Sequence, residues 1–180
     1  MKKLLLILLC VPLMFFCGEN EKDKKNKNST QKTLENGLIT GTITFTGDEQ
    51  GYSFEKDKIY KMSSSWAREG KKLNYIDIAW SDFNLATPIL DGKNGIMDFR
   101  LHHMGTIDFD NLSYFEVDSE DYWKWVYGRD DGNNEFKDHV FILKTHKGTY
   151  VKFIVKNIDR DSQSLDIEYV HQPNGTKSFQ

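Results

Sequence analysis

The chain has 180 residues, 38% of them hydrophobic, and a formal net charge of −3 at pH 7. This length suits one domain with a short leader, and the lack of a basic excess argues against nucleic acid as a partner. Both cysteines, Cys10 and Cys17, lie near the start of the chain. The rest therefore has no thiolate for a disulfide framework or a cysteine-ligated metal.

The chain begins with the features of a secretion leader. Two lysines follow Met1, and residues 4–16 form an unbroken apolar run of 13 residues. A secretion signal has an apolar core of about 7–15 residues, whereas a membrane-spanning helix needs about 20. The run ends at Cys17, where a bacterial lipoprotein carries its lipidated cysteine, although bulky Phe16 stands where a small residue is usual. We predict that residues 1–17 are a lipoprotein signal ending at lipidated Cys17; a signal-peptidase leader with an incidental cysteine is the alternative.

Residues 18–36 are predicted to form a disordered, charged tether. The segment has one aliphatic residue, Leu34, among many charges, so it cannot bury enough apolar surface to offset the entropy of ordering. Nineteen flexible residues span roughly 25 Å, which suits a domain held away from a membrane. The acidic residues after Cys17 are similar to signals that send lipoproteins to the outer face of an outer membrane. We therefore expect an exported protein anchored in the outer membrane, at the cell surface or the periplasmic face.

Residues 37–180 show the period-two alternation of apolar and polar side chains that is typical of strands. Gly148 stands in a short loop where a hairpin needs a positive φ, and residues 118–122 are long enough for one helical turn. The fold class that we predict is mostly β, a single twisted antiparallel domain of meander or sandwich type with little helix. The predicted strands are 38–45, 52–54, 59–62, 75–83, 99–109, 140–145, 149–157, 165–171 and 177–179.

No enzyme motif appears in the sequence. The five histidines form no HExxH, and Ser63-Ser64-Ser65 has no G-x-S-x-G frame. The acidic stretch at residues 130–134 lacks the alternation and the closing glutamate of an EF-hand loop, so an exposed turn is expected there. We therefore expect a non-enzyme, with no metal site beyond a heme iron.

The run His102, His103 and Met104 carries three metal-binding side chains in a predicted strand. Adjacent strand residues point to opposite faces, so His102 and Met104 share one face while His103 lies on the other, apolar face. A ligand is therefore met by His102 with Met104, or by His103 alone. The alternative for His102 and Met104 is a solvated strand edge, and the alternative for His103 is a histidine buried in the core.

Aromatic residues crowd into positions 122–127, where Trp123, Trp125 and Tyr127 alternate onto one face. Such a stripe usually packs in a core or between sheets. If it is exposed, it forms a platform for a flat ligand such as a porphyrin or a sugar ring.

Several of these segments together are similar to one known family. They are Tyr52-Ser53-Phe54, Ile76-Asp77-Ile78-Ala79, Trp123 to Tyr127, Val140 to Thr145, Lys147-Gly148, Tyr150 to Phe153, Ile167-Glu168-Tyr169 and Gln172-Pro173-Asn174-Gly175. The chain resembles the HmuY-like heme-binding lipoproteins of Gram-negative bacteria over about residues 52–179, most specifically in the last 40 or so. The tryptophan that the family has before Asp77 is replaced here by Ile76.

The resemblance implies a nearly all-β domain that binds heme between loops at one end and supplies it to an outer-membrane transporter. The family holds iron through two axial side chains, His or Met, one before the aromatic strand and one closely after it. By position, the resemblance leaves His102, His103 and Met104 as candidates for the first ligand. The second falls near Tyr127, where there is no His or Met, although tyrosine can ligate heme iron.

Three functions remain open on the sequence. The first is a lipoprotein that captures heme or a related porphyrin. The second is a glycan-binding lipoprotein that uses Trp123, Trp125 and Tyr127 as a stacking platform. The third is a structural or adhesion partner in a larger envelope complex, without a small ligand.

Overall fold

The computed structural model describes residues 28–63, 75–88, 100–117, 123–124, 126–127 and 136–180. All regular structure in these residues is β-strand, which confirms the predicted mostly-β, antiparallel domain. Within them, no helix is long and apolar enough to cross a membrane. The strands are β1 (Ser29–Thr33), β2 (Ile39–Thr46), β3 (Gln50–Ser53), β4 (Lys58–Lys61), β5 (Ile78–Ser81), β6 (Asn84–Ala86), β7 (Leu101–Gly105), β8 (Val126–Tyr127), β9 (Val140–Lys144), β10 (Tyr150–Asp159) and β11 (Ser164–Gln172).

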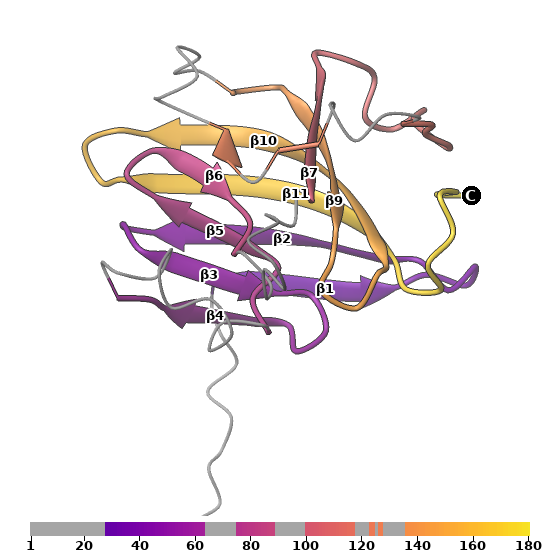
Figure 1. Cartoon of the computed structure of the whole chain (residues 1–180), viewed down its shortest axis with the longest axis horizontal. Helices are drawn as coiled ribbons and strands as arrows, with labels where there is room; N and C mark the ends of the chain where they lie inside the picture. Colours follow the sequence, from indigo (N-terminus) through magenta and orange to yellow (C-terminus); the bar gives the residue numbers. More distant parts are fainter. Residues whose placement is uncertain (1–27, 64–74, 89–99, 118–122, 125, 128–135) are drawn as a thin grey trace, which may run out of the picture.

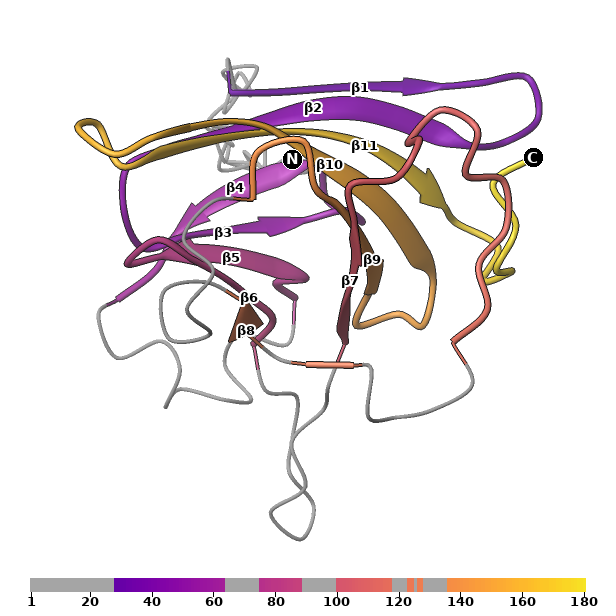
Figure 2. The same ribbon diagram turned by 90° about the horizontal axis from the view of Figure 1, so that it is seen from above.

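The strands form two sheets that pack as a sandwich (Figure 1). One has six strands in the order β1-β2-β11-β10-β9-β7, and the other has five in the order β4-β3-β5-β6-β8. The six-stranded sheet curls strongly, so that β7 and β9 lie at a steep angle to β1 and β2 (Figure 2). Both sheets contribute to the main core, whose largest buried side chains include Trp80, Tyr169, Phe45, Phe141 and Phe153.

The strands β9, β10 and β11 form the predicted meander. Val140, Val151 and Phe153 are fully buried, as the alternation predicts, and β9 pairs with β10 in register from Tyr150↔Lys144 to Ile154↔Val140. Gly148 has φ +79°, in the left-handed region that a tight hairpin loop requires of one of its residues. The last predicted strand, 177–179, is instead a single bridge between Ser178 and Tyr114.

The predicted tether of residues 18–36 is wrong over its second half. Ser29–Thr33 forms β1, which pairs with β2 from Ser29↔Ile43 to Thr33↔Ile39. This strand is polar and mostly exposed, so it is held by main-chain hydrogen bonds and by hydroxyl contacts such as Thr30 with Thr42 at 2.9 Å. The first part of the tether and the predicted signal lie outside the described residues, as does the predicted helical turn at 118–122.

Candidate functional site

The strand β7 lies at one end of the six-stranded sheet, beside β9. It is shorter than the predicted strand 99–109, because the chain turns at Gly105, where φ is +76°. Its other side pairs with the aromatic segment, where Leu101 and Lys124 exchange backbone hydrogen bonds of 2.9 and 2.8 Å. The segment then enters the five-stranded sheet as β8, which pairs with β6. The aromatic segment therefore links the two sheets beside β7.

His102 points to the outer face of the sheet, away from the main core. It pairs across the sheet with Ile142, which in turn pairs with Lys152 on β10. Its ring centroid lies 5.8 Å from that of Trp123, with the planes tilted by 48°. Met104 and Trp123, both partly buried, pack on the same outer cluster as Ile142. The structure thus brings His102 beside Trp123 and places Met104 on the same outer cluster as that tryptophan.

His103 lies on the opposite face, as strand alternation predicts. Its Nε2 is 2.9 Å from Nδ1 of His139, and its ring stacks on Phe141 at a centroid distance of 4.8 Å. Burial lowers the pKa of His103, and the nearby charges of His139, His102 and Lys124 lower it further. The histidine that was predicted on the apolar face therefore belongs to the core side of the sheet.

The remaining predicted site residues are less fully described. Tyr127 lies in β8, where its backbone pairs with Leu85. Trp125 and Cys17 lie outside the described residues, so the predicted platform of three aromatic rings stays a prediction.

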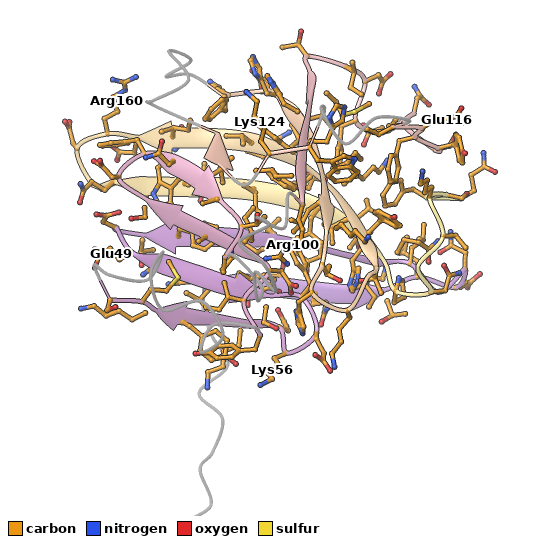
Figure 3. The ribbon with its side chains drawn as sticks, in the orientation of Figure 1. Glu49, Lys56, Arg100, Glu116, Lys124 and Arg160 are labelled. Carbon is orange, nitrogen blue, oxygen red and sulfur yellow. The ribbon has the colours of Figure 1, made fainter. Side chains whose placement is uncertain are left out.

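Arg100, just before β7, departs from the predicted pattern. The alternation places it on the polar face with His102, yet its side chain is only 1% exposed, and its Nη2 donates a 2.6 Å hydrogen bond to the carbonyl of Pro88. Figure 3 draws Arg100 in the middle of the view, with Lys124 labelled nearby. Sequence alternation cannot detect a buried guanidinium of this kind, because a backbone carbonyl distant from the strand pattern can serve as one of its partners.

A network of polar contacts, which the sequence pattern did not predict, connects the β3–β4 turn to the β9–β10 loop. Asp77 is fully buried and accepts hydrogen bonds from the backbone N of Phe54 at 2.9 Å and from the backbone N of His146 at 2.8 Å. The Nδ1 of His146 is also 2.6 Å from Asp77, and its Nε2 is 3.3 Å from Glu55. These contacts join the β3–β4 turn to the β9–β10 loop. A buried carboxylate with this many donors is a structural anchor.

Two observations limit the chemistry of the site. No group of three or more His, Cys, Asp or Glu side chains in the described ranges is placed to hold a metal ion. Of the two potential iron donors, His102 lies beside the ring of Trp123, and Met104 packs on the outer cluster that includes Ile142. That arrangement suits binding of a flat ligand with one coordinating side chain.

Comparisons with known proteins add no assignment: no protein-family model matches the chain, and no significant match is found among curated proteins.

Proposed function

We propose that the chain is an exported lipoprotein, anchored through Cys17, that captures heme at the outer face of β7 and supplies it to an outer-membrane transporter. The observation that carries the proposal is the position of His102 beside Trp123, with ring centroids 5.8 Å apart. Histidine is a common ligand of heme iron, and the indole ring offers flat apolar surface to a porphyrin. The activity that we propose is binding, without a catalytic step.

The donors on this face suit a heme held through a single residue of β7. His102 and Met104 are two residues apart on β7, so they lie at most about 7 Å apart along it, even across the register shift between His103 and Gly105; Met104 packs on the outer cluster with Ile142. Side chains on the same face at that spacing approach a flat ligand from one side, so only one of them would hold its iron. His102 therefore supplies the imidazole, and Met104 adds apolar surface.

His103 is unsuited to the same ligand. It faces the main core, where it is stacked on Phe141 and bonded to His139. A heme reaching its Nε2 would have to separate this histidine pair and enter a packed aromatic cluster, which would lose contacts throughout the cluster. The proposal therefore assigns the two neighbouring histidines different roles.

When it is bound, heme would supply an iron centre for the imidazole of His102. The chain's own contribution is to orient that imidazole and to cover part of the ring. The indole ring of Trp123 lies next to that imidazole, with the ring planes tilted by 48°. Ile142, which pairs with His102 across the sheet, is fully buried on the same face.

A hemin titration of the full chain, followed in the Soret region, tests the proposal. We expect a saturable spectral change. We expect Trp123→Ala to weaken hemin binding several-fold, because the porphyrin loses a stacking partner. Tyr60→Ala is the matched control, since Tyr60 lies on β4 of the other sheet, and it should leave the titration unchanged.

The absence of any spectral change would contradict the proposal. It would favour the glycan-binding or structural envelope functions instead.

A further inference from the structure

His103 and His139 form a pair that the proposed function does not use. Their rings are nearly parallel, at 17°, with centroids 4.9 Å apart. Nε2 of His103 and Nδ1 of His139 lie 2.9 Å apart. Both side chains are partly buried, so they are shielded from water without being sealed from it.

The position of His103 is fixed by a stack of aromatic rings. Its imidazole lies on Phe141 at 4.8 Å and 19°, and Phe141 lies on Phe153 at 5.1 Å and 11°. Phe141 and Phe153 are fully buried in the main core. The ring of His103 therefore has little freedom to tilt.

The position of His139 is fixed through its backbone. Its N–H donates to the carbonyl of Phe136 at 2.9 Å, and its carbonyl accepts from the N–H of Val155 at 3.1 Å. The preceding residue, Asp138, has φ +63° and donates its N–H to the carbonyl of Val155 at 2.7 Å. A tight turn thus holds the backbone of His139 in place, and the hydrogen bond with His103 orients its imidazole.

The separation of the two nitrogens also matches a chelate. Two metal–nitrogen bonds of about 2.05 Å at a right angle place their nitrogens about 2.9 Å apart, whereas a tetrahedral angle gives about 3.3 Å. Right angles between nitrogen ligands are typical of tetragonal Cu²⁺ and Ni²⁺. Cu²⁺ binds such ligands most strongly among the divalent ions of the first transition row.

We propose that His103 and His139 form a two-imidazole chelate for a divalent transition-metal ion, with Cu²⁺ the preferred ion. Because the described residues hold no third His, Cys, Asp or Glu at this point, water fills the remaining positions. This site lies on the opposite face of β7 from His102, so it does not depend on heme binding.

The electrostatics around the pair are mixed. Burial lowers the pKa of His103, and so do its neighbours His139, His102 and Lys124. A lowered pKa keeps the imidazole neutral, which is the form that binds metals. The positive charge of Lys124, in contrast, opposes a cation, so we expect moderate rather than very tight binding.

The test uses Cu²⁺ alone as the probe, with the full chain followed by calorimetry and electron paramagnetic resonance. We expect one Cu²⁺ per chain, and a spectrum with coupling to two imidazole nitrogens. His103→Asn and His139→Asn should each weaken binding at least tenfold. His146→Asn is the control and should leave the affinity unchanged, because that imidazole is already bound to Asp77.

Two results would overturn the site. One is a wild-type spectrum that shows either no bound Cu²⁺ or a Cu²⁺ coupled to only one nitrogen. This measurement needs no variant, so misfolding of a variant cannot produce the result. The other is a His103→Asn/His139→Asn protein that binds Cu²⁺ as wild type does. In either event the pair is a plain hydrogen bond between imidazoles. Retention of hemin binding by His103→Asn would further separate this site from the proposed heme site.

Discussion

Lys152 stands on the outer face of β10 and is only 4% exposed. Its Nζ donates hydrogen bonds to the carbonyls of Phe109 at 2.6 Å and Leu112 at 2.9 Å. The same ammonium lies 4.7 Å from the ring centroid of Phe109 and 5.7 Å from that of Phe179. One side chain thus holds both the loop after β7 and the C-terminal residues against the sheet.

Replacing this lysine should loosen that loop. Lys152→Met keeps much of the apolar stem but leaves two carbonyls without their donor, so we expect the free energy of unfolding to fall by about 1–3 kcal/mol. Urea denaturation measures the change. The exposed Lys144→Met serves as the control and should stay within about 0.5 kcal/mol of wild type. Equal effects of the two substitutions would show that Lys152 does not hold the loop after β7 and the C-terminal residues against the sheet.

His171, near the end of β11, is a buried histidine with a measurable consequence. Its Nε2 is 2.8 Å from Oγ1 of Thr149. Burial lowers its pKa from the ordinary value, and the charge of Asp77 offsets part of this effect. Its neutral form is therefore favoured in the folded protein.

The stability of the protein should consequently fall in mild acid. An unfolded histidine takes up a proton near pH 6.5, whereas folded His171 does so only at lower pH. Between these two pH values the unfolded state binds more protons, so stability decreases as the pH drops below about 6.5, by at most about 1.4 kcal/mol per pH unit for one histidine. His171→Gln should make the decrease shallower in chemical unfolding between pH 7.5 and 5. An unchanged slope would rule His171 out as the cause.

The strands that could be predicted are those whose side chains alternate between core and surface. In β10 and β11 the apolar positions such as Val151 and Ile167 are buried, so the sequence itself marks them. β1 has no such signal, because its sequence is polar and its pairing with β2 depends on backbone hydrogen bonds. Gly41 is the local feature of β2 that fits this pairing, because a Cβ at that position would collide with the carbonyl of Thr30 in β1.

The same distinction applies to the candidate site. Alternation alone predicts that His102 and His103 face opposite sides, because this is a local property of any strand. The pairing of His103 with His139 spans 36 residues, and the contact of His102 with Trp123 depends on how the aromatic segment crosses β7. Such contacts depend on sheet order, which the sequence pattern did not determine.

The β9–β10 hairpin offers a direct test of turn chemistry. A Cβ at Gly148 would meet no atom within 4 Å, so a substitution there costs only backbone strain. With φ at +79°, Gly148→Val should destabilise the protein by about 1–3 kcal/mol in thermal or urea unfolding. Gly148→Asn, which tolerates this conformation better, should be milder. A neutral Gly148→Val would show that the loop does not need its glycine.

The aromatic segment connects the two sheets as it passes from β7 to β6. Lys124 bonds to Leu101 of one sheet, and β8 continues into the other. The proposed heme site therefore lies beside a connection between the two layers, where the position of Trp123 depends on both.

The proposed anchor limits how far the start of β1 can lie from a membrane. β1 begins at Ser29, twelve residues after Cys17, and a chain of that length spans at most about 40 Å. Cys17→Ser should release the protein from membranes in a fractionation experiment, because the lipid would be lost. Cys10→Ser is the control, since Cys10 lies inside the predicted signal, and should leave the protein bound. Continued membrane association of the Cys17→Ser protein would contradict the anchor.

The central claim is that the outer face of β7, through His102, binds heme while His103 on the inner face does not. The most direct measurement is the near-infrared absorption of the hemin complexes of His102→Ala and His103→Ala, where charge-transfer bands report the axial ligand of the iron. The account predicts that His102→Ala loses the wild-type bands and that His103→Ala keeps them. Loss of the bands in His103→Ala, or an unchanged spectrum in His102→Ala, would contradict it.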